Sequence, residues 1–406
     1  MKRALSVLLV MSLLFCPVYA SELGDEAYID TGEISDPSIF EETVPAMSAA
    51  GVDIGAPSAI LIEKETGTVL YEKDADTVRA PASVTKIMTL LLIMEAIDAG
   101  TLKLDDTITT SAAAAGMGGS QIFLEEGEQM SLHEMLKSIV VSSANDASVA
   151  VAEHIAGTEG TFVQLMNDRA AALGCTNTTF LNCSGLPVED QENSTTARDL
   201  SLIAQALLTH DLIKEYTTIW MDTVRNGEFG LSNTNKLIYY YDGATGLKTG
   251  FTQLAKYCLA ASAQRDGVEY IAIIMGAETS DIRFESAKTL LSFAFANYTV
   301  VEAQPDDVLM PIPVELGTVD YVQPILGENS TVLMEKSEAA NITKTVELDA
   351  SVAAPVEAGQ QIGTLTISGP DGELAKVPIV AGDDVAKITW GQVFGKFMTI
   401  IFTGGL

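Results

Sequence analysis

Ser83 and Lys86 are the residues of this chain whose types and spacing best suit covalent chemistry. They form its one Ser-x-x-Lys sequence. A serine hydroxyl is a weak nucleophile until a base takes its proton, and burial in an apolar helix favours the neutral, proton-accepting form of lysine. Residues three apart share a helical face, so Lys86 is expected one turn beyond Ser83. The alternative is a helix-capping serine followed by a lysine that reaches the surface.

Two further short motifs could complete such a site. Ser143 and Asn145 occur in Ser-Ala-Asn at a predicted break between two helices, where they would offer a hydroxyl for proton transfer and an amide for a substrate. Lys248, Thr249 and Gly250 lie on a predicted strand. The lysine and threonine could bind a substrate carboxylate, and the glycine would let a substrate lie close to the backbone. Alone, each motif also has an ordinary explanation as a helix cap or a strand end.

The elements that must position these motifs follow from hydrophobic periodicity. A hairpin is predicted around Glu65-Thr66-Gly67, followed by a helix after Ser83 that is apolar on nearly every side and should be buried. Further helices are predicted at residues 131–141, 147–155, 161–173, 198–210 and 282–295, and strands at 247–252, 257–264 and 268–274. Consecutive strands after a helical block favour an α+β fold with an antiparallel sheet packed with helices, and argue against a repeating βαβ fold.

The first 50 residues are expected to stand apart from this fold. Lys2 and Arg3 precede an apolar run from Ala4 to Cys16, and Val18-Tyr19-Ala20 offers the small residues of a signal-peptidase site. The run is short for a membrane span. Residues 1–20 are therefore predicted to be a cleaved signal peptide rather than a membrane anchor, and residues 21–50 a flexible acidic lead-in. The protein is expected to be exported.

Composition excludes several classes of function. The formal net charge is −32, so the chain lacks the basic surface that non-specific nucleic-acid binding requires. His133, His154 and His210 share no metal-ligand spacing, so no zinc site is expected. Three cysteines follow the predicted signal peptide, too sparse a set for a disulfide framework. A single Cys175–Cys183 bridge is disfavoured.

The C-terminal third has a different pattern. Residues 299–385 are rich in Val, Ile and Thr between turn signals, which predicts a small all-β domain without chemically capable clusters. In residues 386–406 the apolar positions share one helical face: Trp390, Val393, Phe394, Phe397, Met398 and Ile401. This pattern predicts an amphipathic helix that lies at a membrane surface. The alternative is a final helix packed on the β domain.

In combination, the three motifs resemble the D-alanyl-D-alanine carboxypeptidases among the low-molecular-mass penicillin-binding proteins. The resemblance rests on Ala82-Ser83-Val84-Thr85-Lys86-Ile87-Met88-Thr89, Ser142-Ser143-Ala144-Asn145-Asp146-Ala147, Asn182-Cys183-Ser184-Gly185-Leu186-Pro187 and Gly246-Leu247-Lys248-Thr249-Gly250-Phe251-Thr252. It covers residues 45–298 and extends to the β domain and the tail. It implies a β-lactamase/transpeptidase-like catalytic domain at residues 51–298, anchored at the outer face of the cytoplasmic membrane or in the cell wall.

The resemblance also implies roles for the first two motifs. Ser83 would attack the carbonyl between the two D-alanines that end a peptidoglycan stem peptide, and Lys86 would accept its proton. Ser143 would help to pass a proton to the leaving D-alanine, and Asn145 would orient the substrate amide or Lys86. Water would then hydrolyse the acyl-enzyme. β-Lactam antibiotics would acylate the same Ser83 and leave slowly.

For the third motif, the resemblance implies substrate binding. Lys248 and Thr249 would hold the terminal carboxylate of the peptide, on the strand that also contains Gly250. Backbone N–H groups of Ser83 and Phe251 would form an oxyanion hole that stabilises the developing negative charge. No metal or organic cofactor is implied.

Departures from the family pattern leave two alternatives. The middle motif lacks the Asp of Ser-Asp-Asn, and Phe251 stands where some relatives carry His. Arg283 could assist carboxylate binding but cannot be aligned firmly. A β-lactamase would need rapid deacylation, usually through a dedicated glutamate and a water, and the β domain and tail suit wall-anchored work better. A catalytically silent wall-binding protein on the same fold would not need a buried lysine beside a serine.

Overall fold

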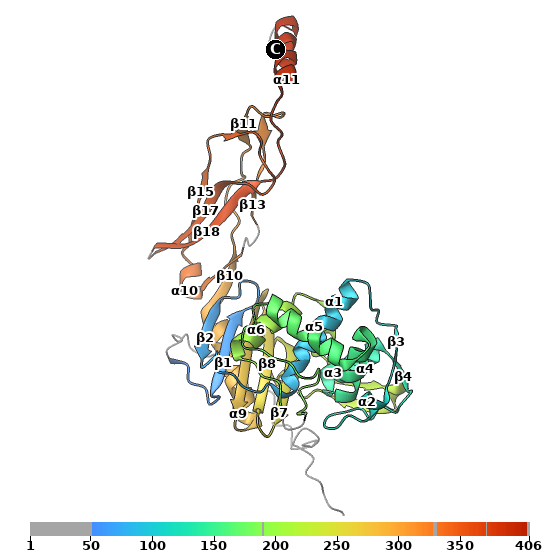
Figure 1. Cartoon of the computed structure of the whole chain (residues 1–406). Helices are drawn as coiled ribbons and strands as arrows, with labels where there is room; N and C mark the ends of the chain where they lie inside the picture. Colours follow the sequence, from blue (N-terminus) through green and yellow to red (C-terminus); the bar gives the residue numbers. More distant parts are fainter. Residues whose placement is uncertain (1–50, 189–190, 328–330, 371, 404–406) are drawn as a thin grey trace, which may run out of the picture.

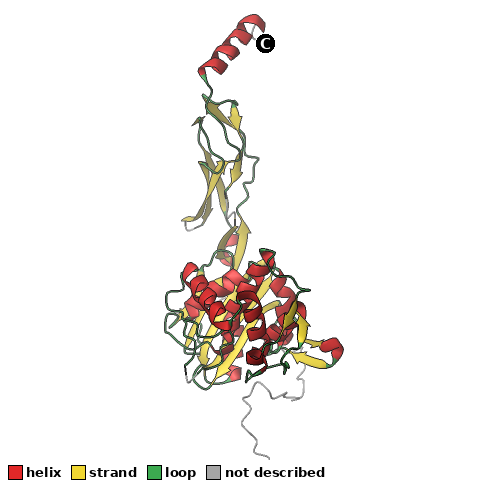
Figure 2. Ribbon diagram, turned by 45° about the vertical axis from the view of Figure 1, so that its right-hand side comes forward, coloured by secondary structure: helices red, strands yellow, loops and turns green. Residues whose placement is uncertain are grey.

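The computed structural model describes residues 51–188, 191–327, 331–370 and 372–403. The predicted signal peptide and lead-in lie outside these residues. A larger unit of helices and strands, residues 51–297, is followed by a narrower β unit and then by a helix at the opposite end of the molecule (Figure 1). Figure 2 shows the same division, with nearly all the helices gathered in the larger unit.

The larger unit is built on a five-stranded sheet in the order β2-β1-β9-β8-β7, in which every neighbouring pair is antiparallel. Its strands are Ser58–Glu63 (β1), Val69–Lys73 (β2), Ala244–Thr252 (β7), Lys256–Arg265 (β8) and Val268–Ala277 (β9). The predicted α+β fold with an antiparallel sheet is therefore confirmed. Strand β7, which contains Lys248, lies at one edge of the sheet.

The helices of the larger unit are Lys86–Asp98 (α1), Ala112–Ala115 (α2), Leu132–Val141 (α3), Asn145–Ala156 (α4), Glu159–Ala172 (α5), Ala197–Leu207 (α6), Leu212–Thr217 (α7), Leu237–Tyr240 (α8) and Ser280–Asn297 (α9). The five longer helices predicted beyond Lys86 are confirmed, with no end shifted by more than three residues. Helix α1 is buried on nearly every side, as its apolar sequence predicts. It therefore fixes Lys86, its first residue, inside the unit.

Strand β9 is buried along its whole length because both faces of the sheet are covered. Successive side chains of a strand point to opposite faces. Ile271 and Ile273 pack in one core with α1, whereas Tyr270, Ala272 and Ile274 pack in a second core with α9. Each buried isoleucine contributes about 1.5–3 kcal/mol relative to an exposed one, so the central strand holds the two layers together.

Two small two-stranded sheets at the side of the larger unit have no counterpart in the sequence prediction. Thr107–Thr109 (β3) pairs with Gln129–Ser131 (β4), and Met221–Val224 (β5) pairs with Phe229–Ser232 (β6). The short 3₁₀ turn Arg225–Gly227 (η5) joins β5 to β6. Strands of three or four residues give too short a period-two pattern to be recognised from sequence.

The β unit contains Tyr298–Glu302 (β10), Ile312–Glu315 (β11), Tyr321–Val322 (β12), Pro324–Leu326 (β13), Thr331–Glu335 (β14), Thr343–Leu348 (β15), Val352–Ala353 (β16), Gln361–Gly369 (β17) and Gly372–Ala381 (β18), with one short helix, Lys336–Ala339 (α10). Strands β10 and β14 form a ribbon between the units. Val300 and Leu333 pack on the core of the larger unit, whereas Val301 and Val332 pack on that of the β unit. The ribbon thus joins both cores.

The last helix, Trp390–Thr403 (α11), lies beyond β11 at the end of the molecule farthest from the larger unit (Figure 1). Trp390 is 89% exposed and Phe394 is 64% exposed. These exposures contradict the alternative of a helix packed on the β unit. Within the part of the chain that the structure describes, no helix has both the length and the apolar character needed to span a bilayer.

Candidate active site

Ser83 lies in the 3₁₀ turn Ala82–Thr85 (η4), directly before α1. Ala82 adopts φ +48°, in the left-handed region that a residue with a side chain rarely occupies. The turn leaves Ser83 partly exposed, whereas Lys86 is 0% exposed. The alternative of a lysine that reaches the surface is therefore wrong.

Three oxygen atoms surround the Lys86 amine. Lys86 Nζ lies 3.2 Å from Ser83 Oγ, 2.7 Å from Asn145 Oδ1 and 2.8 Å from the carbonyl oxygen of Ser184. A neutral amine has two N–H bonds and one lone pair. The two shorter contacts, to Asn145 and Ser184, suit the two N–H bonds, because both oxygens can only accept hydrogen bonds. The lone pair can then point at Ser83 and receive its proton. The arrangement suits a general base within reach of its nucleophile.

Asn145 is the first residue of α4 and is almost completely buried. Its Nδ2 donates to the carbonyl oxygen of Gly118 at 2.8 Å, and its backbone N donates to the carbonyl oxygen of Ser120 at 2.7 Å. Because Nδ2 faces a carbonyl, Oδ1 must face Lys86. The loop that contains Gly118 therefore determines the orientation of the amide.

Ser143 lies between α3 and α4, with φ +61° and no exposed surface. Among the described residues its Oγ has no hydrogen-bond partner. A buried hydroxyl without a partner is rare and calls for an explanation. Ser143 lies two residues before Asn145 in the chain, but its Oγ is not within hydrogen-bonding distance of Lys86. Its part in proton transfer stays a prediction.

Lys248 and Thr249 are buried on β7. Lys248 Nζ donates to the carbonyl oxygen of Thr249 at 3.0 Å, and Thr249 Oγ1 donates to Thr234 Oγ1 at 2.6 Å. Sequence reasoning did not select Thr234. Thr234 lies in a loop that has no hydrophobic periodicity. Its backbone N donates to the carbonyl oxygen of Val141, and this contact holds it beside the site.

Gly250 packs closely against the turn that contains Ser83, and its predicted contact with a substrate stays a prediction. A Cβ atom at this position would lie 2.7 Å from the carbonyl oxygen of Pro81 and 2.9 Å from the backbone N of Ser83. Such distances are too short for a real side chain, so glycine lets β7 pack against the turn that contains Ser83. The backbone N–H groups of Ser83 and Phe251 consequently lie on adjoining segments. The Phe251 ring packs on Tyr257, with centroids 4.4 Å apart.

The Ser184 carbonyl belongs to the segment Asn182–Pro187, which carries part of the family resemblance but for which no role was predicted. Asn182 Oδ1 accepts hydrogen bonds from the backbone N of Ser184 at 3.1 Å and of Gly185 at 2.6 Å. Gly185 has φ +82°, and a side chain there would overlap the carbonyl of Ala82. An asparagine shortly before a glycine is a turn signature, and that signal could have identified the segment.

Two other groups lie outside the reacting cluster. Arg283 Nη1 donates to the carbonyl oxygens of Gly250 at 3.3 Å and Cys258 at 3.4 Å, so it supports strands β7 and β8. Cys175, Cys183 and Cys258 are free and buried, so the disfavoured bridge is absent. Burial raises the pKa of the Cys258 thiol to about 11. A thiolate nucleophile is therefore disfavoured.

These contacts place the hydroxyl of Ser83, the amine of Lys86, the amide of Asn145 and the carbonyl of Ser184, from three separate segments, around one point, with a glycine-containing edge strand beside them. A serine activated by a lysine forms a covalent ester with an acyl donor. The geometry therefore suits acyl transfer.

The sequence profile of the D-alanyl-D-alanine carboxypeptidase family matches residues 43–279. That of the penicillin-binding protein 5 C-terminal domain matches residues 298–387. D-alanyl-D-alanine carboxypeptidase DacF of Bacillus subtilis is 43% identical over 341 residues, which are 82% of this chain and 86% of the relative. DacC of Escherichia coli is 32% identical over 366 residues, which are 87% and 90% of the two chains.

Solved structures agree with these matches. Penicillin-binding protein 5 from Haemophilus influenzae has a TM-score of 0.72 at 28% identity, covering 83% of this chain and 99% of that chain. Penicillin-binding protein D2 from Listeria monocytogenes, in its ampicillin-bound form, has a TM-score of 0.56 at 31% identity. It covers 60% of this chain and 99% of its own. The larger unit thus shares its fold with β-lactam-binding proteins.

Proposed function

The chain belongs to the D-alanyl-D-alanine carboxypeptidase family of serine peptidases, and from this premise we propose how its residues remove the terminal D-alanine from peptidoglycan stem peptides. The nucleophile is Ser83 and the general base is Lys86. The observation that carries this assignment is the 3.2 Å distance between Lys86 Nζ and Ser83 Oγ, with the amine held by Asn145 and Ser184.

The reaction has two halves. Ser83 Oγ forms a bond to the carbonyl carbon between the two D-alanines while its proton passes to Lys86 Nζ. The tetrahedral intermediate then collapses, the bond to the D-alanine nitrogen breaks, and that nitrogen takes the proton held by Lys86, passed on through Ser143. Water hydrolyses the resulting ester, so that Ser83 regains its proton and the shortened peptide leaves as a carboxylic acid. The buried, unpartnered hydroxyl of Ser143 supports a role in which the substrate supplies its partner.

The edge strand β7 binds the substrate in this proposal. Lys248 and Thr249 hold the terminal carboxylate, and the backbone N–H groups of Ser83 and Phe251 stabilise the oxyanion. The close packing of Gly250 on the turn that contains Ser83 supports the pairing of these two donors, since it keeps the segments in contact. Such preorganised donors need no rearrangement as charge develops.

The β-lactamase alternative depends on how fast the acyl-enzyme is hydrolysed. β-Lactamases use a glutamate that activates a water. Glu189 lies four residues before Asn193 in the segment between the second and third motifs, but it is outside the described residues. Asn193 is buried and donates to Thr85 Oγ1 at 2.8 Å, which supports a structural role for it. The lifetime of a penicillin adduct distinguishes the two enzymes.

Residues 21–406, incubated with benzylpenicillin, are expected to carry one stable adduct on the peptide that contains Ser83. They are also expected to release D-alanine from a peptide ending in D-Ala-D-Ala. Mass spectrometry measures the adduct, and an amino-acid assay measures the release. Consumption of the drug without a lasting adduct would indicate a β-lactamase. If the protein forms no adduct and releases no D-alanine, it is a silent binding protein, and the proposal is contradicted.

We also propose that the protein is exported and that α11 lies on the outer surface of the cytoplasmic membrane. Support comes from the exposed Trp390 and Phe394, and from the place of α11 at the far end of the β unit. Burying an aromatic face among lipid headgroups is favourable. The β unit would then hold the active site away from the membrane.

Deleting residues 386–406 is expected to move the exported protein from the membrane fraction to the soluble fraction. Turnover of a small soluble peptide should change less than about twofold, because α11 is remote from Ser83. Fractionation and D-alanine release measure the two effects. Gln392→Ala, on the same helix, is the control and should leave fractionation unchanged. A truncated protein that still sediments with membranes would contradict the anchor.

A further inference from the structure

We propose that Arg225 is a positioning residue for the reaction: it fixes the loop that directs the amide oxygen of Asn145 at Lys86. The loop spans residues 116–128 and is called the glycine loop here, because Gly116, Gly118, Gly119 and Gly127 belong to it. The inference rests on the proposed function, in which Lys86 is the base and Asn145 orients it.

The glycine loop has neither helix nor strand between the end of α2 at Ala115 and the start of β4 at Gln129. Fixing each residue of such a segment costs about 1–2 kcal/mol of conformational free energy, and glycine loses the most freedom. Ile122 and Leu124 are buried and anchor the loop in the core, whereas Phe123 between them is 66% exposed. Other contacts must therefore hold its backbone in one conformation.

Asp146 holds the inner side of the glycine loop. Its buried carboxylate accepts hydrogen bonds from the backbone N of Ile122, at 3.2 and 3.1 Å, and of Leu124, at 3.0 Å. Hydrogen bonds to a charged acceptor are stronger than those between neutral groups. Since Asp146 directly follows Asn145 in α4, the loop is fastened to the helix that carries the amide.

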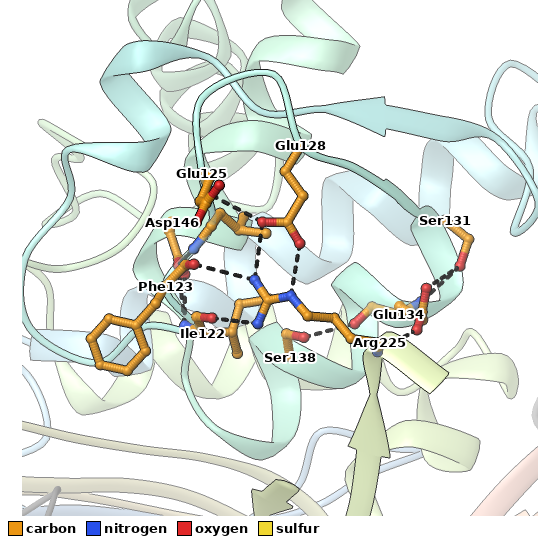
Figure 3. Close-up of polar contacts among 10 residues, drawn as sticks. Ile122, Phe123, Glu125, Glu128, Ser131, Glu134, Ser138, Asp146 and Arg225 are labelled. Atoms are coloured by element: carbon orange, nitrogen blue, oxygen red, sulfur yellow. Dashed lines mark hydrogen bonds and ion pairs between the residues drawn. The ribbon is translucent and has the colours of Figure 1, made fainter. Parts of the chain in front are cut away.

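Arg225 holds the same part of the glycine loop by donating hydrogen bonds to the carbonyl oxygens of the loop (Figure 3). Its Nη1 donates to the carbonyl oxygen of Ile122 at 2.8 Å, and its Nη2 donates to that of Phe123 at 3.2 Å. The guanidinium also forms a two-pronged ion pair with Glu128, at 2.7 and 3.1 Å. One planar cation thereby ties the middle of the glycine loop to its end, a geometry that lysine cannot reproduce.

The backbone of Arg225 is itself anchored. Its N–H donates to Glu134 Oε1 at 2.9 Å, in the first turn of α3, and its φ of +54° turns the chain sharply at this point. Glu134 is seen beside Arg225 in Figure 3. Helix α3 leads directly to Ser143. Arg225 therefore connects the β5–β6 hairpin, α3 and the glycine loop.

The consequence for the site arises at the other end of the glycine loop. The carbonyl of Gly118 accepts from Asn145 Nδ2, and that of Ser120 accepts from the Asn145 backbone. If the loop moves away, Nδ2 loses its acceptor and the amide can rotate. Nδ2 would then face Lys86, donor against donor, and the amine would lose the contact that orients its lone pair toward Ser83.

Arg225→Gln in residues 21–406 is expected to lower the rate of acylation by benzylpenicillin about 10- to 100-fold, a typical cost of misplacing a reacting group by about 1 Å. For D-alanine release, kcat should fall while KM changes less than about twofold, since the carboxylate-binding β7 is untouched. Arg225→Lys should recover part of the rate. Arg198→Gln is the matched control, because Arg198 forms comparable ion pairs with Asp76 and Glu72 outside the site.

A double-mutant cycle with Asn145→Ala separates positioning from general stability. If Arg225 acts through Asn145, adding Arg225→Gln to Asn145→Ala should lower the acylation rate less than twofold further. An equal loss in both backgrounds would overturn the inference, as would an unchanged rate in folded Arg225→Gln. If that variant does not fold, Glu128→Gln is measured instead, and an unchanged rate there also overturns it. An inactive wild-type chain would count against the proposed function, not against Arg225 alone.

Discussion

Ser83→Ala is expected to lower D-alanine release by at least about 10⁴-fold and to abolish covalent labelling by benzylpenicillin. The proposed reaction proceeds through an ester on Ser83 Oγ, and alanine offers no atom that can form it. The fold should persist, because the hydroxyl is partly exposed and its loss costs about 1 kcal/mol of a hydrogen bond to Lys86. Peptide turnover, mass spectrometry and thermal unfolding measure the three quantities.

Ser201→Ala is the matched control for this experiment. Ser201 is a buried serine of α6 whose hydroxyl donates to the carbonyl oxygen of Arg198, outside the site. Its replacement should leave both labelling and turnover within about twofold of the wild type. Covalent labelling that survives in Ser83→Ala would show that another residue is the nucleophile.

Lys86→Met is the second substitution with a large expected effect. It should slow acylation about 10²- to 10⁴-fold, the usual contribution of a general base. Methionine fills most of the volume of the buried side chain, but it accepts no proton from Ser83 and donates nothing to Asn145. Stopped-flow acylation by benzylpenicillin measures the rate, and circular dichroism checks the fold.

Lys86→Arg distinguishes a base from a fixed positive charge. Arginine keeps the charge but does not lose its proton in proteins, so acylation should remain slow. Substantial activity in this variant would contradict proton transfer to Lys86. Lys73→Met is the control, because Lys73 also donates to a backbone carbonyl, that of Ile54, but lies on β2 at the opposite edge of the sheet from β7.

The parts of the fold that could be predicted are those with long, regular hydrophobic patterns. Helix α1 is apolar on nearly every side and is buried on nearly every side. Asp-Gly is a residue pair typical of a tight hairpin turn, and Asp266 and Gly267, between β8 and β9, both have positive φ, at 50° and 82°. The small β3–β4 and β5–β6 sheets were missed, because strands of three or four residues carry too little pattern and their place is set by packing.

The sequence by itself determined the relation between Ser83 and Lys86. Their separation of three residues is a local property, since helical geometry alone brings such a pair to one face. It also determined the order of the three motifs, and with it the family resemblance. Burial of the lysine followed from the apolar helix that begins with it.

Only the tertiary structure decided what surrounds this pair. Asn145 and Ser184 lie 59 and 98 residues from Lys86, and Arg225 reaches the site through a loop about 100 residues earlier in the chain. The close packing of Gly250 on the turn that contains Ser83 was not part of the sequence prediction. Hydrophobic periodicity predicts which face of an element is buried, but not which segment packs on it. The contacts that orient Lys86 depend on that packing, so they could not be read from spacing.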